Sequence, residues 1–286
     1  MDEAVEAELV RRGQRGDVLE HLAADPLGNL VLMDMTDRIG RRPAPSELRP
    51  EVGVLWSGRR VAAVAGLRPN VVFDIEADDG VVEAFLPLIE TLGVGLVKSH
   101  ERSADVLWRH LQRRAPRRPL LDRTETAYVL SAQAGRQGFP GSEAPPARPA
   151  TEDDLDALVV AARESLREEG RPDPFSDDPV GGRRWVRGRL RRARVVEAGG
   201  RVVFVGYADV QRREGWLLQG VYTWPEARGR GMARAGVAAL CREAFAEGAD
   251  HVQLSVVDGN TPGERLYAGL GFAPFGRFRT ILFGNA

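Results

Sequence analysis

The alternation of apolar and polar residues predicts several strands in the second half of the chain. Apolar residues there either alternate with polar ones or form short runs, as in half-buried or buried strands. Strands are expected at Val195–Ala198, Val202–Val210, Trp216–Thr223 and His251–Val257. Between the first two, Gly199 and Gly200 predict a hairpin turn.

Helical spacing appears in the same half. Thr151 to Asp154 can cap a helix whose apolar stripe is Leu155, Leu158, Val159, Ala162 and Leu166. A longer helix is expected after the strand that ends at Thr223. One of its faces is apolar and is formed by Val237, Leu240, Cys241, Ala244 and Phe245. A short helix is expected from about Pro262 to Leu270, and "FAPFGRFRTILF" is expected to close the sheet.

The first half shows the same order of elements more weakly. Strands are expected at Val52–Trp56, Arg60–Leu67, Val71–Ile75, Val94–Lys98 and Thr126–Leu130. Helices are expected near Val81–Leu92 and Ala104–Arg113. This order suggests that the two halves share one fold without sharing a sequence.

A stretch rich in Gly, Pro and Ala divides the chain. The segment "SAQAGRQGFPGSEAPPARPA", Ser131 to Ala150, has no periodicity and is interpreted as a linker. A length of 286 residues fits two domains, each large enough for its own core. The expected organisation is a domain at residues 1–131, a linker at 132–150 and a second domain at 151–286. The expected fold class is α/β, with mixed sheets of the α+β kind.

Composition narrows the functional classes. A formal charge of −1 gives no overall field that would select nucleic acid or an acidic partner. Cys241 is the only cysteine, which excludes an internal disulfide, and it lies on an apolar helix stripe where a buried structural thiol is expected. The four histidines show no metal-ligand spacing, so no metal is expected. Because the acidic start lacks a signal core and no apolar run spans ~20 residues, a soluble cytoplasmic protein without membrane partners is expected.

The stretch "VYTWPEARGRGMARAGVAALC", Val221 to Cys241, joins an apolar strand to an alanine-rich helix. A helix N-terminus presents unpaired amides, and Gly229 and Gly231 lack the Cβ atoms that would block a phosphate. Arg228, Arg230 and Arg234 add positive charge. A Walker loop would need a Lys-Ser/Thr pair, and a dinucleotide fingerprint would need a small residue at Arg234. A phosphate cradle is therefore predicted, and ordinary turn chemistry is the alternative.

Two motifs carry a family resemblance. The loop fits Gln/Arg-x-x-Gly-x-Gly/Ala, with Arg228, Gly231 and Ala233 at the fixed positions. Downstream, "LSVVDGNTPGERLYAGLGF" places Asn260 and Tyr267 before a Gly-Phe turn. From about residue 151 to 283 the sequence resembles the GNAT superfamily of acyl-coenzyme A dependent N-acetyltransferases. The whole chain resembles bacterial two-domain GNAT proteins, which implies tandem GNAT-like domains with a degenerate N-terminal one.

The resemblance implies a role for each matching position. The strand before the loop would splay from its neighbour, and its main chain at Val221, Tyr222 and Thr223 would pair with the pantetheine arm of acetyl-CoA. The pyrophosphate would lie on the loop formed by Arg228, Gly229, Arg230, Gly231, Met232, Ala233 and Arg234. Thr261, Pro262 and Glu264 are expected to form a capping box that leaves the Asn260 side chain free to bond the arm.

Tyr267 would lie near the thioester sulfur and protonate it as the catalytic acid, and the alternative is a core tyrosine beside Leu266 and Leu270. An amide near Thr223 would polarise the carbonyl.

The general base is missing from this pattern. The positions where many GNAT enzymes carry a glutamate fall on Leu217 and Ser255, and neither can act as a base alone. Asp209, Tyr207 and Glu214 lie nearby but are expected to be ordinary sheet or turn residues. The acceptor amine would then lose its proton through water or arrive neutral. A coenzyme-A-binding regulatory module without turnover stays open as the alternative to an N-acetyltransferase.

The segment "RRWVRGRLRRAR", residues 183–194, concentrates arginines. It could hold an acidic acceptor, the 3'-phosphate of coenzyme A or nucleic acid. A solvated helix face paired with Asp173, Asp177 and Asp178 is the expected arrangement, which does not favour nucleic acid. The expected partner is a small-molecule or peptide amine, and a homo-oligomer is left open.

The loop of the first half that corresponds to the cradle is "DIEADDGVV". Its acids Glu76, Asp78 and Asp79 would repel a pyrophosphate, and it has no glycine pair. One coenzyme site per chain is therefore expected.

Overall fold

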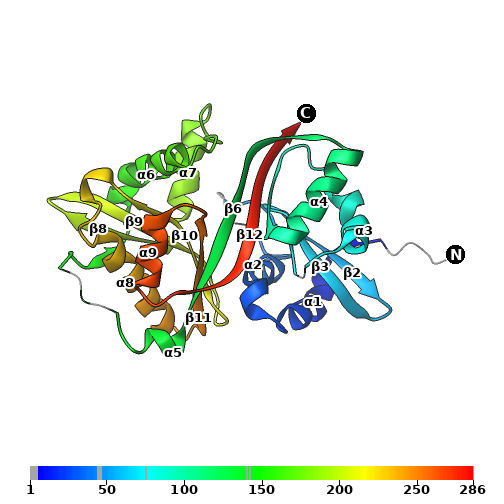
Figure 1. Cartoon of the computed structure of the whole chain (residues 1–286), viewed down its shortest axis with the longest axis horizontal. Coiled ribbons are helices and arrows are strands. Elements are labelled where there is room, and N and C mark those ends of the chain that lie inside the picture. The colour runs from blue at the N-terminus through cyan, green and yellow to red at the C-terminus, as the bar shows by residue number, and fades with distance from the viewer. Residues whose placement is uncertain (1–5, 44–46, 75, 140, 142, 286) are drawn as a thin grey trace. The chain divides into compact units, whose positions relative to one another are not determined.

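The computed structural model describes residues 6–43, 47–74, 76–139, 141 and 143–285, and the chain forms two compact units. Unit 1 comprises Met1–Pro43, Leu48–Thr126 and Gly276–Ala286. Unit 2 comprises Ala44–Glu47 and Ala127–Phe275. Both units combine helices with sheet, as the expected fold class requires (Figure 1).

Unit 1 is built around a four-stranded antiparallel sheet in the order β1-β2-β3-β4. Its strands and helices are β1 (Glu8–Leu9), η1 (Arg12–Gln14), α1 (Arg15–Leu22), α2 (Pro26–Asp37), β2 (Glu51–Ser57), β3 (Arg60–Arg68), β4 (Val72–Phe73), α3 (Asp79–Ile89), β5 (Gly95–His100) and α4 (Glu101–Arg114). Ile75, at the end of one predicted strand, lies outside the described residues. Two further strands, β6 (Arg117–Ser131) and β12 (Ala273–Asn285), run from one unit into the other.

Unit 2 contains the predicted strand and helix pattern of the second half. Its elements are α5 (Ala132–Gly135), β7 (Ala147–Pro149), η2 (Glu152–Asp154), α6 (Leu155–Glu168), α7 (Pro179–Gly188), η3 (Leu190–Arg192), β8 (Ala193–Ala198), β9 (Arg201–Gln211), β10 (Trp216–Thr223), η4 (Pro225–Ala227), α8 (Met232–Ala246), β11 (His251–Val257) and α9 (Thr261–Ala268). The strands lie in the order β6-β11-β10-β9-β8-β7. Strands β7 to β10 are antiparallel, and β10 and β11 are parallel.

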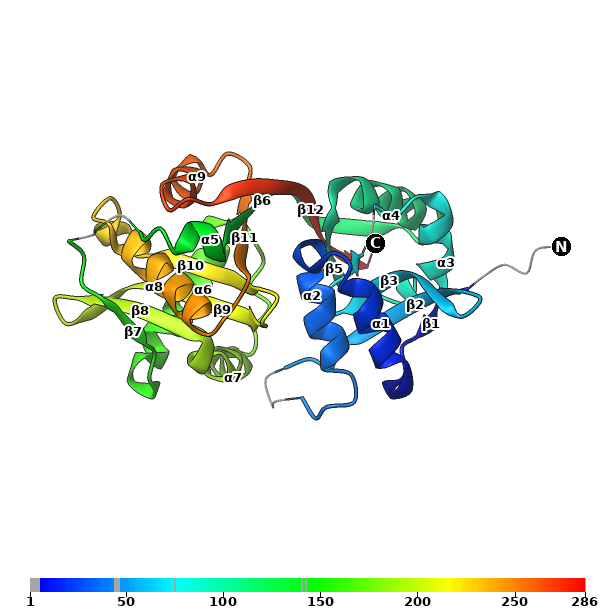
Figure 2. The ribbon, with the colours of Figure 1, turned by 90° about the horizontal axis from the view of Figure 1, so that it is seen from below.

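Both faces of the unit 2 sheet are covered because its strands alternate between two sets of apolar residues. On one face, Phe204 and Trp216 pack in a core with α8 and with Tyr267 of α9. On the other face, Val205 and Tyr207 pack with α6 and α7. Figures 1 and 2 show α8 and α6 lying along this sheet. The two layers leave the carboxyl ends of β10 and β11 as the place where the cradle loop emerges.

The region predicted as a linker has structure of its own. It contains α5, and β7 pairs with β8 through Ala147 and Pro149. Arg148 donates two hydrogen bonds to Asp154, at 2.7 and 2.8 Å. Three residues of edge strand are too few to give a readable period, which explains why the sequence pattern missed them. Pro140 and Ser142 lie outside the described residues.

The division into units differs from the predicted boundaries at the C-terminus. Phe278 to Phe283 of β12 pair antiparallel with β5. Ile281 and Phe283 are fully buried in the core of unit 1. The strand that was expected to close the second domain therefore also completes the first.

Candidate active site

The parallel strands β10 and β11 separate along their length. They pair at Trp216 with Val252 and at Leu217 with Gln253, while β10 continues to Thr223. On its other side β10 pairs with β9, with a register shift between Gln219 and Tyr222. The edge of β10 that faces β11 is thus open beyond Leu217, which is the predicted splay.

The loop after β10 ends at an uncapped helix. Gly231 is the N-cap of α8, and within the described part of the chain this helix has no side-chain cap. Gly229 and Gly231 have φ angles of 73° and 79°, in the left-handed region that favours glycine. A Cβ on Gly229 would meet nothing within 4 Å, so backbone conformation explains this glycine better than crowding does. The amides at the start of α8 are therefore available to an anion.

Arg228 does not contribute a free charge to this loop. Its guanidinium donates to both carboxylate oxygens of Glu168, at 2.8 and 2.7 Å, and to the Thr223 carbonyl at 3.0 Å. The Tyr222 hydroxyl also donates to Glu168, at 3.3 Å. Arg228 therefore fixes the loop against the end of α6. The available positive charge of the cradle comes from Arg230 and Arg234.

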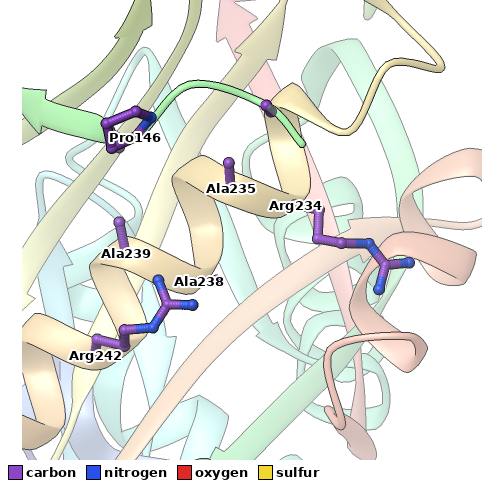
Figure 3. A pocket seen from close by; sticks show the side chains of 8 residues that line it. Pro146, Arg234, Ala235, Ala238, Ala239 and Arg242 are labelled. Carbon is purple, nitrogen blue, oxygen red and sulfur yellow. The ribbon is translucent and has the colours of Figure 1, made fainter. Parts of the chain in front are cut away.

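Arg230 is exposed, and Arg234 reaches the Gly269 carbonyl at 3.4 Å. Arg234 also contributes to a groove of about 410 Å³ on the flank of α8. The other lining residues are Ala144, Pro146, Ala147, Ala235, Ala238, Ala239 and Arg242. Figure 3 shows Arg234 and Arg242 on α8, with Pro146 opposite the alanines. The cradle and the groove are thus continuous along one helix.

Asn260 is placed differently from the expectation. It is the N-cap of α9, and its Oδ1 accepts a hydrogen bond from the Gly263 amide at 3.1 Å. The predicted capping box placed the N-cap at Thr261, one residue after the N-cap in the structure. The Asn260 oxygen is therefore occupied by the helix, and only its Nδ2 group is left to donate to a ligand.

The aromatic ring of Tyr267 lies in the hydrophobic core. It lies on α9, is 7% exposed and packs edge-on against Phe272 with ring centroids 5.7 Å apart. Its hydroxyl makes no hydrogen bond with the described residues. Burial, together with the nearby Cys241 thiol, raises the pKa of Tyr267 well above its ordinary value. The phenol is therefore protonated at neutral pH and can act as a proton donor.

Cys241 is fully buried, as expected for a structural thiol, and burial raises its pKa. Leu217 and Ser255, the two positions considered for a base, are both half-buried. Glu214 is paired with Arg212 at 3.1 Å. Asp209 accepts a hydrogen bond from Arg189 Nε at 3.0 Å. Neither of these carboxylates is an unpaired base.

Five of the seven arginines in residues 183–194 form ion pairs, but not with the predicted acids. Its ion pairs are Arg183 with Asp156, Arg187 with Glu152, Arg189 with Asp209, Arg192 with Glu47 and Arg194 with Glu243. Asp173 pairs with Arg163 instead, and Asp178 caps α7 through the Gly181 amide. These partners are distant in sequence, so helix spacing could not identify them. A segment paired in this way offers little charge to nucleic acid.

In unit 1, side chains accept hydrogen bonds from main-chain amides between β4 and the start of α3. Ser99 Oγ accepts from the Phe73 amide at 3.2 Å, and Ser103 Oγ accepts from the Ala77 amide at 2.8 Å. Asp78 caps α3 by accepting from the Val81 amide at 3.0 Å. The main-chain groups that are open in unit 2 are thus occupied in unit 1.

A mixed sheet with splayed parallel strands and a glycine loop opening a long helix defines an acyltransferase-type fold, and comparisons with known proteins agree. Residues 157–272 match the model of the "Acetyltransferase (GNAT) family". These residues therefore carry the match to a GNAT acetyltransferase domain. No curated protein matches the sequence.

Solved structures with similar folds extend over the whole chain. A GCN5-related N-acetyltransferase from Sphaerobacter thermophilus superposes with a TM-score of 0.63 at 17% identity, covering 99% of this chain and 96% of that one. A tandem GNAT protein from the clavulanic acid biosynthesis pathway gives 0.57 at 16% identity, covering 98% and 100%. A Drosophila protein gives 0.73 at 13% identity, covering 98% of both chains. The chain therefore has a tandem GNAT-like architecture.

No helix in the described ranges is both long and apolar enough to cross a membrane.

Proposed function

We propose that the chain is an N-acetyltransferase that moves an acetyl group from acetyl-CoA to a primary amine by direct transfer in a ternary complex. The observation that carries this proposal is the open edge of β10 followed by the uncapped start of α8, within a segment that matches the GNAT family. Both features leave main-chain donors without partners where the family binds its cosubstrate. The residues present therefore fit acetyl-CoA.

Each part of the open site has a proposed role in binding. The main chain at Val221, Tyr222 and Thr223 pairs with the pantetheine arm. The amides from Gly229 to Arg234 hold the pyrophosphate, and Asn260 Nδ2 donates to the arm. Arg228 acts indirectly, because its ion pair with Glu168 keeps the loop in place.

The groove beside the cradle suggests where the nucleotide end lies. Arg234 and Arg242 are eight residues apart, which corresponds to about 12 Å along α8. Alanines between them leave room for an adenosine. We assign the 3'-phosphate of coenzyme A to Arg242, because the arginines of residues 183–194 are largely neutralised by ion pairs.

Acetyl-CoA supplies an activated thioester when it is bound. Amides on the open edge of β10 polarise the carbonyl group as negative charge develops on its oxygen. The Tyr267 hydroxyl gives its proton to the departing sulfur. The acceptor amine arrives neutral or loses its proton to water, because Leu217 and Ser255 provide no carboxylate.

Calorimetry with coenzyme A tests the cradle. Gly229 and Gly231 are both replaced by valine, which disfavours positive φ, and binding is expected to be lost. The matched control replaces Gly199 and Gly200, whose φ angles are 59° and 74° in the β8–β9 hairpin. The control variant also places valine at two positive φ angles, but it should bind coenzyme A normally. Normal binding by the Gly229/Gly231 variant would refute the cradle.

The missing carboxylate also favours a second candidate, a coenzyme-A-binding regulatory module without turnover. Thiol release from acetyl-CoA in the presence of amines separates the two. Tight binding without thiol release across a broad amine panel would support the regulatory module.

A further inference from the structure

The sheet face opposite α8 carries polar side chains near its centre. These are Tyr207 and Asp209 on β9, Gln219 on β10, and Gln253 and Ser255 on β11, and we call them the polar floor. The alternate residues Ala208, Leu218, Val252, Leu254 and Val256 belong to the apolar core with α8. Gln219 and Tyr207 are direct cross-strand partners, as are Gln253 and Leu217. Strand alternation therefore gathers the polar set on one face.

Gln253 is the member of the polar floor that most requires a partner. It is 6% exposed, and its Oε1 has no hydrogen-bond partner among the described residues. Leaving such a buried polar group unsatisfied is destabilising. Gln253 lies opposite Leu217, at the last pair before β10 and β11 separate. Its amide is therefore at the base of the opening in which the thioester is proposed to lie.

The carboxylates beside this opening are neutralised. Asp209 is paired with Arg189, whose guanidinium also lies 3.9 Å from the centroid of the Tyr207 ring. Glu168 is paired with Arg228. Burial raises the pKa of Tyr207 to about 12, so its phenol is uncharged at neutral pH. The polar floor has hydrogen-bonding capacity but little net charge.

We infer that Gln253 and the polar floor bind the acceptor, and that the acceptor is a primary amine on a small, neutral, hydroxyl-bearing molecule. This inference rests on the proposed function. The Gln253 oxygen accepts a hydrogen bond from the acceptor, and Gln219 and Ser255 are placed to bond its hydroxyl groups. A polyamine or lysine-rich peptide would require unpaired carboxylates to replace the hydration of its additional charges.

The test measures thiol release from acetyl-CoA with named amines. Ethanolamine, serinol and glucosamine represent the neutral hydroxylated class, and spermidine and a lysine-rich peptide represent the polycations. At least one hydroxylated amine is expected to exceed both polycations in kcat/KM by about tenfold or more. A preference for either polycation, or no turnover of all three hydroxylated amines, would overturn the inference.

Variants test the role of Gln253 separately. Gln253→Leu keeps the size but removes the amide, and it should raise KM for the preferred amine about tenfold while KM for acetyl-CoA stays constant. The control is Gln211→Leu, at an exposed position near the end of β9, which should change neither constant. A Gln253→Leu enzyme with unchanged amine KM would refute the contact. Thiol release by the unmodified chain with a broad amine panel distinguishes this failure from failure of the proposed function. A failed function predicts no thiol release by the unmodified chain with any amine, whereas a failed Gln253 contact leaves thiol release intact and only the amine KM of Gln253→Leu unchanged.

Discussion

Tyr267 combines a core ring with a hydroxyl that no described residue engages. Replacing it with phenylalanine keeps the ring packed against Phe272 and removes only the proposed proton donor. We expect kcat to fall by about 10²-fold to 10⁴-fold, the range for a general acid, with little change in KM for acetyl-CoA. Steady-state thiol release measures this effect. Full activity of Tyr267→Phe would show that the tyrosine serves only the core.

The raised pKa of Tyr267 adds a second expectation. Burial disfavours the phenolate, so the donor stays protonated up to and beyond the ordinary tyrosine pKa of about 10. The rate should therefore show no alkaline loss attributable to this group below about pH 10. A pH profile of kcat provides the measurement.

Asn260 allows capping and ligand binding to be separated. Asn260→Asp keeps an oxygen that can accept from the Gly263 amide, so α9 should remain capped. It removes the Nδ2 donor, and coenzyme A affinity should fall severalfold. Asn260→Ala should lose the cap as well, which costs about 0.5–2 kcal/mol of stability. Calorimetry and denaturant unfolding of the two variants measure these effects, and equal coenzyme affinity of Asn260→Asp and the unmodified chain would contradict the contact.

At this scale the sequence identifies backbone requirements better than side-chain partners. Gly229 and Gly231 could be predicted because positive φ restricts residue choice at a turn. The Arg228 pair could not, because Glu168 lies at the end of a helix 60 residues earlier in the chain. The cap position of Asn260 was missed by one residue because Asn and Thr are both good caps.

Among the elements, α8 concentrates the proposed cosubstrate contacts. Replacing Arg242 with alanine should weaken coenzyme A binding about tenfold, because a phosphate contact is lost. Dephospho-coenzyme A, which lacks the 3'-phosphate, should bind the variant and the unmodified chain equally. Calorimetry with both ligands tests the assignment, and Arg201→Ala in the exposed β8–β9 hairpin is the control. An equal loss of affinity for coenzyme A and for dephospho-coenzyme A would show that Arg242 does not contact the 3'-phosphate.

Elements with a clear period were predicted, and those without one were missed. The predicted bounds of β10 and β11 agree with the structure, since each strand alternates between two different environments. Helix α2 was missed because Asn29 and Thr36 are buried along with its apolar residues, so the helix has no polar face to reveal its period. The arginine-rich segment, residues 183–194, was predicted as one helix. It contains the second half of α7, all of η3 and the first residues of β8.

At the level of the whole molecule, the two units share one fold but differ in how the corresponding main-chain amides are satisfied. In unit 2 the start of α8 has no side-chain cap, whereas in unit 1 Asp78 caps α3. The sequence showed the acids of that loop but not the serines, because Ser99 and Ser103 lie beyond the next helix. The role of β12 in unit 1 was also hidden, since strand pairing over such a separation leaves no local pattern.

This difference between the units predicts the binding stoichiometry. Calorimetry should give one coenzyme A per chain, and the Gly229/Gly231 valine variant should remove all binding. Replacing Ser99 and Ser103 with alanine should not create a second site, because Asp78 and Asp79 still place negative charge at the start of α3. It should instead destabilise unit 1 by about 1–3 kcal/mol for each buried amide left without a partner. A stoichiometry of two for the unmodified chain would show that unit 1 retains a working cradle.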